Sequence, residues 1–140
     1  MDLQELSDRQ EITDLITSVT LAIDTMSFTD LRLLFTDDAV LDYSSAGGPT
    51  GDCDVVVPWL ERALGGFDRF QHVIGQIAIY LLGDNAQVTA YYTSPRVRLD
   101  PDGTEKVREV GGYHHHDLVR TGEGWRSRTM VDDRVWSRNS

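Results

Sequence analysis

Apolar residues near the start of the chain recur with the period of a helix. A capping-box pattern, Ser7 followed by Gln10, precedes apolar positions that are mostly three or four residues apart: Ile12, Leu15, Ile16, Val19, Ala22, Ile23 and Met26. This spacing predicts one long amphipathic helix whose apolar face packs on a core.

Two shorter helices and a strand are predicted next. Ser27 with Asp30 repeats the cap pattern before a short helix, which we expect to include Phe35 and to end at residues 36–38. Residues 40–43 have the composition of a short strand, and residues 44–51 form a loop rich in Gly, Ser and Pro. A third helix is predicted over Asp54–Leu64.

The second half of the chain alternates between apolar and polar residues, as strands do. Turn residues at 83–85, 100–103 and 121–124 separate four predicted strands: Phe70–Leu82, Ala86–Leu99, Glu105–Arg120 and Trp125–Trp136. The pair Gly111-Gly112 predicts a bulge or bend in the third strand. Helices followed by long antiparallel hairpins indicate one α+β domain over residues 1–140, with the helices on one face of a curved sheet.

The composition excludes several classes of partner. The chain has 140 residues and a formal net charge of −10. Because nucleic acids and anionic membranes bind basic surfaces, we expect neither as a partner. The single cysteine, Cys53, cannot form an internal disulfide and fits a reducing compartment. With no basic-apolar leader and no apolar run of membrane-spanning length, we expect a cytoplasmic protein.

His72 is the residue best suited to chemistry. A histidine backed by a carboxylate is a general base that works near neutral pH, although a sheet histidine bonded only to a backbone carbonyl is the alternative. The candidate carboxylate is Asp24, 48 residues upstream in the first helix. At about 100° per residue, Asp24 lies about 140° from the centre of the apolar face, so amphipathicity alone predicts that it is either exposed or a C-terminal residue of the helix.

The order of the elements and four motifs resemble the SnoaL-like branch of the nuclear-transport-factor-2-like (NTF2-like) superfamily. The motifs are Ile23-Asp24, residues 34–39, Gln71-His72, and residues 118–121 followed by 124–126. The resemblance implies a cone: three N-terminal helices packed on a strongly curved mixed or antiparallel sheet that encloses a pocket. Members include scytalone dehydratase, a bile-acid dehydratase, hexachlorocyclohexane dehydrochlorinase and polyketide cyclases, so the fold alone names no reaction.

The resemblance also implies roles for particular residues. In the dehydratase and dehydrochlorinase members, a histidine at the place of His72 is the catalytic base, and an aspartate at the place of Asp24 reaches its ring. Asp24 is therefore expected to fix the tautomer of His72 and to stabilise its imidazolium. We expect a homodimer or homotrimer that binds a small-molecule substrate and uses no cofactor.

Further residues are candidates for the pocket wall. Tyr43 ends the short strand. Tyr91 and Tyr92 lie on opposite faces of another predicted strand, and of these two tyrosines we expect Tyr91 to face the pocket. A phenol in an apolar pocket can polarise a carbonyl or protonate a leaving hydroxyl, whereas core or dimer packing is the ordinary role of a tyrosine. The other candidates are Phe67, Leu41, Val110, His114 and His116.

Three consecutive histidines raise the question of a metal. His114 and His116 share one face of a strand and His115 the other. Together with His72, the inward pair has the ligand types of a zinc site. No other residues have ligand spacing, and the resembling branch is mostly metal-free, so we expect no metal. One of the pair is instead expected to be a polar pocket contact or proton shuttle.

These observations predict a cofactor-independent lyase of the dehydratase type. It would act on a small hydrophobic or polycyclic organic substrate by His-Asp general-base proton abstraction. Where the dehydrochlorinase holds its leaving chloride with a lysine and an arginine, this chain has Val19 and Met130, so loss of chloride is disfavoured. Two alternatives stay open: a cyclase or isomerase of polyketide or other secondary metabolism, and a non-catalytic ligand-binding domain.

Overall fold

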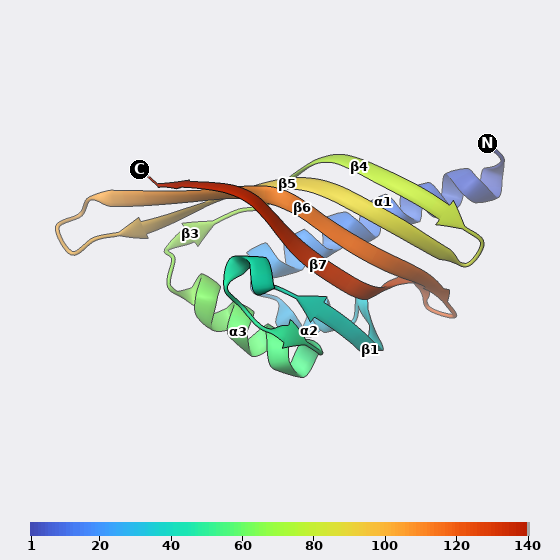
Figure 1. Ribbon diagram of the computed structural model, residues 1–140, viewed down its shortest axis with the longest axis horizontal. Helices are drawn as coiled ribbons and strands as arrows, with labels where there is room; N and C mark the ends of the chain where they lie inside the picture. The colour runs from blue at the N-terminus through green and yellow to red at the C-terminus, as the bar shows by residue number, and fades with distance from the viewer. Residues whose placement is uncertain (140) are drawn as a thin grey trace.

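Three helices and a seven-stranded sheet make up residues 1–139, the part of the chain that the computed structural model describes (Figure 1). The helices are α1 (Leu3–Asp24), α2 (Phe28–Arg32) and α3 (Cys53–Gly65), and a 3₁₀ turn, η1, covers Ser44–Ala46. The strands are β1 (Phe35–Asp42), β2 (Thr50–Gly51), β3 (Arg69–Phe70), β4 (Val73–Leu82), β5 (Asn85–Leu99), β6 (Glu105–Thr121) and β7 (Gly124–Asn139).

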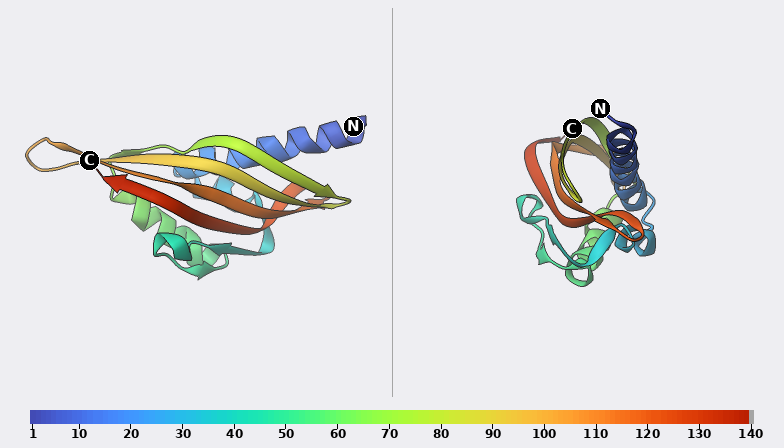
Figure 2. Two further views of the ribbon diagram at one scale, coloured as in Figure 1. Left: turned by 45° about the horizontal axis from the view of Figure 1, so that its top comes forward. Right: turned by 90° about the vertical axis from the view of Figure 1, so that its right-hand side faces the viewer.

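The sheet is mixed and strongly curved. Its order is β2-β1-β7-β6-β5-β3, and β4 also pairs with β5. The β1–β7 pair is parallel and the other pairs are antiparallel. Figure 2 shows the sheet curling round, with α1 along its open side and α3 below it. The α+β cone expected from the sequence is confirmed. A register shift occurs at Gly111-Gly112 as expected, but the extra residue of the bulge, Val135, lies in β7 opposite the two glycines and not in their own strand.

Buried apolar side chains form two clusters along α1. The second half of α1 packs with α2, α3 and β1 through Val19, Ile23, Leu31, Leu41, Val56, Leu60 and Met130, among others. The first half packs on the sheet through Ile12, Leu15, Ile16, Val88, Leu118 and Trp125, among others. Each large apolar side chain buried in this way contributes roughly 1.5–3 kcal/mol, so packing holds α1 against the sheet.

The first helix begins earlier than the sequence predicted. Asp2, not Ser7, is the N-cap, and its carboxylate accepts a hydrogen bond from the amide of Glu5 at 2.8 Å. An aspartate cap satisfies one of the free N–H groups of the first turn, so α1 extends to Leu3.

Residues 35–38 extend a strand instead of ending the second helix, which corrects a second prediction. The helix stops at Arg32, and β1 begins at Phe35, which pairs with Ser127 of β7. The amide of Ser127 donates to the carbonyl of Leu34 at 3.0 Å, so the chain enters the sheet directly after the helix.

The predicted strand over residues 70–82 is interrupted at Gln71 and His72. Both β3 and β4 pair with β5, but the amide of His72 donates to Asp24 Oδ2 at 2.8 Å instead of to a neighbouring strand. The Asp24 carboxylate thus accepts a hydrogen bond from an amide that would bond to the neighbouring strand if the strand were continuous. The interruption fixes the position of His72.

Candidate active site

Asp24 and His72 meet at the end of α1. The Asp24 carboxylate contacts His72 twice: Oδ2 accepts from the backbone amide at 2.8 Å, and Oδ1 lies 2.6 Å from ring Nδ1. The His72 side chain is 6% exposed and that of Asp24 is 17% exposed. Of the two alternatives from amphipathicity, solvent exposure is therefore wrong, whereas Asp24 is indeed the last residue of the helix. The contact with His72 holds the carboxylate against the protein.

This contact defines which ring nitrogen of His72 is basic. With Oδ1 of an ionised carboxylate at 2.6 Å, Nδ1 carries the proton and donates it. The neutral ring therefore has its lone pair on Nε2. Because the second carboxylate oxygen holds the backbone amide, the ring and its own main chain are fixed by one group.

His72 lines a small cavity between α1, α3 and the sheet. The cavity has a volume of about 20 Å³. That volume admits one water-sized group, so a larger ligand requires lining side chains to move. Its walls come from α1, the residue between β1 and η1, α3, the β3–β4 interruption, β5, β6 and β7. The lining residues are Ile23, Tyr43, Trp59, Leu60, Ala63, Leu64, His72, Arg96, His114, Asp132 and Arg134.

Tyr43 and His114 bring hydrogen-bonding groups into this wall in their neutral forms. Burial raises the pKa of the Tyr43 hydroxyl and lowers that of the His114 ring well below its usual value. The only hydrogen-bond acceptor of the Tyr43 hydroxyl is the sulfur of Met130 at 4.0 Å, and His114 Nδ1 has no partner among residues 1–139. Both groups therefore keep hydrogen-bonding capacity for a ligand.

Tyr92, Asp132 and His114 form a buried polar cluster beside His72. The Tyr92 hydroxyl donates to Asp132 Oδ1 at 2.5 Å, and the rings of Tyr92 and His114 stack with centroids 4.2 Å apart. The same Oδ1 lies 3.7 Å from His114 Nε2. Burial raises the pKa of Asp132, and the hydrogen bond from Tyr92 opposes this shift. Tyr92 thus occupies the inward place that we expected for Tyr91.

Two arginines complete the wall, and neither was predicted from the sequence. Arg96 comes from β5 and Arg134 from β7, and burial lowers the pKa of Arg96, with a further contribution from Arg134. A signal was present, because Arg96 continues the inward alternation of Val88, Ala90 and Tyr92. Arg134 likewise continues the inward alternation that Met130 sets in β7.

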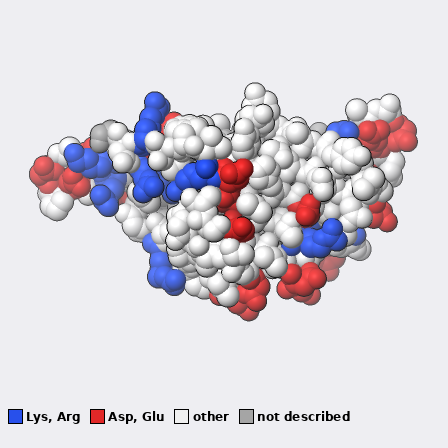
Figure 3. All heavy atoms as spheres, viewed as in Figure 1, with Lys and Arg blue, Asp and Glu red and all other residues white. Residues whose placement is uncertain are grey.

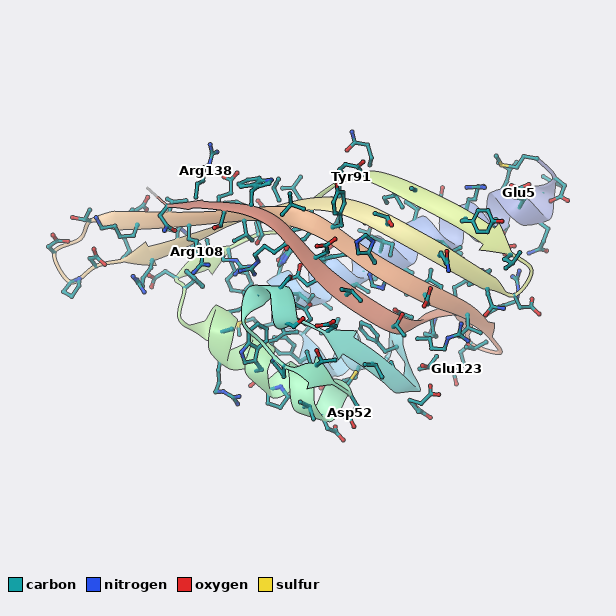
Figure 4. All side chains as sticks on the ribbon, viewed as in Figure 1. Glu5, Asp52, Tyr91, Arg108, Glu123 and Arg138 are labelled. Atoms are coloured by element: carbon teal, nitrogen blue, oxygen red, sulfur yellow. The ribbon has the colours of Figure 1, made fainter. Side chains whose placement is uncertain are left out.

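Several predicted pocket residues lie elsewhere. Tyr91 is 45% exposed on the outer face of the sheet, and Figure 4 shows its ring directed away from α3. His116 is buried and bonds to Ser127 Oγ at 2.8 Å through Nδ1. Leu41 and Val110 are buried in the core and do not reach this small cavity.

Phe67 also stays outside the cavity wall. Its ring lies 5.9 Å from the guanidinium carbon of Arg96, so it flanks a lining residue.

The histidine run follows strand alternation. His114 and His116 are buried, whereas the side chain of His115 is 41% exposed and contacts Asp133. Within residues 1–139, no group of three or more His, Cys, Asp or Glu residues is arranged to hold a metal ion. The described helices include none with both the length and the apolar character needed to cross a membrane.

Comparison with known proteins identifies the family. Residues 4–131 match the model of the SnoaL-like domain, so the chain belongs to that family, as the sequence motifs indicated. An uncharacterised protein of Mycobacterium tuberculosis is 32% identical over 138 residues, which cover 99% of this chain and 92% of that protein.

Several solved structures have the same fold. A Kribbella flavida protein has 26% identity and a TM-score of 0.84, with 96% of this chain and 95% of that chain covered. A type 3 hexachlorocyclohexane dehydrochlorinase from Novosphingobium barchaimii has 14% identity and a TM-score of 0.83, with 100% and 94% covered. A Novosphingobium aromaticivorans protein, provisionally assigned as a scytalone dehydratase, has 18% identity and a TM-score of 0.80, with 96% and 88% covered.

Proposed function

We propose that this protein is a cofactor-independent lyase of the dehydratase type, in which His72 removes a proton from carbon. The observation that carries the proposal is the double contact of Asp24 with His72 at the cavity wall. A base must be held in one tautomer and must face its substrate, and this contact supports the first requirement while the position of His72 in the lining supports the second.

The reaction is the loss of water from a substrate with a hydroxyl group one carbon beyond an activated C–H bond. His72 Nε2 takes the proton and leaves an enolate carbanion, and the electron pair of this carbanion then becomes the new C=C bond as the C–O bond breaks. The imidazolium, stabilised by Asp24, returns the proton to the departing hydroxyl, which leaves as water. Tyr43 and His114, both neutral, donate hydrogen bonds to the oxygen on which negative charge develops.

The size of the cavity favours a small substrate. At about 20 Å³ it holds one functional group of a ligand, and a polycyclic molecule would displace side chains such as Trp59. A cyclase or isomerase would use the same base and differ only in the fate of the carbanion. Loss of water is favoured because Tyr43 and His114 offer donors beside the base.

Turnover by a His72→Gln variant tests this proposal. We expect a panel of small β-hydroxy carbonyl compounds to include one that the protein dehydrates. The absorbance of the new double bond measures this reaction. Glutamine cannot accept the proton, so kcat should fall by a factor of roughly 10² to 10⁴ while the dissociation constant stays nearly unchanged.

His115→Gln is the matched control, because His115 is half-exposed on the other face of the same sheet. It should retain full turnover. Equal turnover by His72→Gln and the parent protein would contradict the proposal and favour the non-catalytic ligand-binding alternative.

We also infer that two or three copies of the chain associate, as the family resemblance implied. Exposed apolar side chains on the outer face of the sheet support this, since they flank a groove of about 480 Å³: Val73, Tyr91, Val135 and Trp136. Sedimentation velocity would measure the mass, and a monomer at micromolar concentration would contradict this inference.

A further inference from the structure

The cavity contains more positive charge than its own carboxylate neutralises. Arg96 forms no ion pair among residues 1–139, and the only hydrogen bond of its side chain there is a long one, from Nε to Ser94 Oγ at 3.5 Å. The Arg134 side chain is 13% exposed, and its carboxylate contact is loose, with Nη2 3.8 Å from Asp132 Oδ2. Arg134 Nε is buried without any partner in the described part of the chain.

Buried guanidinium groups normally have carboxylate or carbonyl partners, because removing a charge from water is costly unless it is paired. Here Asp132 is the only carboxylate among the cavity-lining residues, which include two guanidinium groups. It contacts only Arg134 of the two, and its closest bond goes to Tyr92 at 2.5 Å. The other polar groups of the wall, Tyr43 and His114, are held neutral by burial. The arginine side of the cavity is therefore left with an excess of about one positive charge.

The remaining carboxylate near the cavity does not remove this excess. Asp24 is engaged on the far side of the His72 ring, where it holds Nδ1 and the backbone amide. When His72 takes up a proton, Asp24 balances the charge of the imidazolium. The charges on the two sides of the cavity are therefore neutralised separately. Asp24 neutralises the His72 imidazolium, and an incoming anion neutralises the excess charge of the arginines.

We propose that Arg96 and Arg134 form a binding site for a carboxylate group of the substrate, so that the lyase acts on β-hydroxy carbonyl compounds that also carry a carboxylate. A carboxylate carries the single negative charge that the arginine side lacks, and its two oxygens match the planar fork of a guanidinium. A phosphate carries up to two charges and exceeds this count. The inference rests on the proposed function for the reaction but not for the binding step.

The surface around the cavity favours the approach of such an anion. Although the chain has a net charge of −10, Figure 3 shows Lys and Arg side chains concentrated toward the end of the molecule where β3 and the ends of β5–β7 lie. Acidic side chains gather along the bottom and at the opposite end in this view, with a further group at the tip of the β5–β6 hairpin. Basic side chains on this part of the surface would raise the association rate of an anionic ligand.

Binding of benzoate and its neutral analogue benzamide to the unaltered protein tests the site. The two probes have the same shape and differ in one charge. We expect titration calorimetry to show benzoate binding at least about tenfold more tightly than benzamide, since hydrogen bonds to charged groups contribute more than neutral ones. Equal affinities would overturn the proposal, and so would tighter binding of inorganic phosphate than of benzoate.

Variants assign the binding to the two arginines. Arg96→Gln and Arg134→Gln should each weaken benzoate binding about tenfold or more and leave benzamide binding unchanged. Arg138→Gln is the control, because Arg138 is 73% exposed and lies outside the cavity. Benzoate affinity that survives both cavity substitutions, or that falls equally in Arg138→Gln, would contradict the assignment.

The two proposals fail separately. His72→Gln should keep the preference for benzoate, because the base takes no part in holding the carboxylate. If that variant still turns over substrate while the arginine variants lose benzoate, only the proposed reaction is wrong. If it loses turnover while benzoate and benzamide bind alike, only the carboxylate site is wrong.

Discussion

Asp24 and His72 form one hydrogen-bonded unit, in which the carboxylate contacts both the backbone amide and the ring of His72. A hydrogen bond at 2.6 Å to an ionised carboxylate is among the strong interactions available to a histidine. Its value for catalysis grows when the ring becomes an imidazolium. Removal of either partner should therefore remove most of the effect of both.

A double-mutant cycle tests this coupling. Asp24→Asn keeps an oxygen near the ring but removes the charge that stabilises the imidazolium, so kcat should fall roughly tenfold or more, by a smaller factor than in His72→Gln. The double variant should be little slower than His72→Gln alone. Rate losses that multiply independently would show that the two residues do not function together.

Sequence reasoning paired His72 with Asp24 and named Tyr43 and His114 of the cavity wall, but it missed Arg96, Asp132 and Arg134. Tyr91 was chosen over Tyr92 although the apolar residues Val88 and Ala90 already fix the inward phase of that strand. Buried arginines such as Arg96 are harder to predict, since a charged residue in an alternating strand normally points to solvent. Their inward position depends on polar side chains that other strands bring to the same cavity.

At the scale of elements, the strand interruption at His72 depends on a long-range contact. The sequence predicted three helices, the long antiparallel strands and all three turns, since periodicity and turn residues are local signals. It did not predict the division into β3 and β4, because the donor that leaves the ladder bonds to Asp24, 48 residues away. Asp24 therefore contributes to stability as well as to the site.

Substitution of Asp24 by alanine should destabilise the fold. The amide of His72 would lose its acceptor in a partly buried position, which typically costs about 1–3 kcal/mol. Asp24→Asn should cost less, because an amide oxygen still accepts the bond. Urea unfolding measures both, with Asp14→Ala on the exposed face of α1 as the control. An Asp24→Ala protein as stable as this control would contradict the structural role.

At the scale of the whole molecule, buried neutral histidines link stability to pH. Burial lowers the pKa of His116 to about 4 and that of His114 in the same direction. The unfolded chain then binds more protons than the folded chain wherever the pH lies below about 6.5. Stability is fully present above that pH and is lost as the pH falls toward the folded-state value. Asp132, whose pKa is raised, acts in the opposite direction.

The His116→Gln variant isolates one share of this pH dependence. Between about pH 7.5 and pH 5, His116 should account for about 2 kcal/mol of the loss in unfolding free energy, given a folded pKa of about 4. The variant should therefore lose less stability than the parent over this range, as measured by urea titration at each pH. His115→Gln, on the exposed side, should follow the parent. Identical pH profiles for the parent and His116→Gln would contradict the assignment.

Exchange of a carbon-bound hydrogen with solvent tests the central claim most directly. With a bound β-hydroxy carbonyl compound in D₂O, proton NMR follows the loss of the hydrogen next to the activating group. Because His72 is the base in this account, the parent protein and His115→Gln should promote exchange at the same rate. His72→Gln should be slower by a factor of roughly 10² to 10⁴. Exchange in His72→Gln at the rate of the parent would contradict the account.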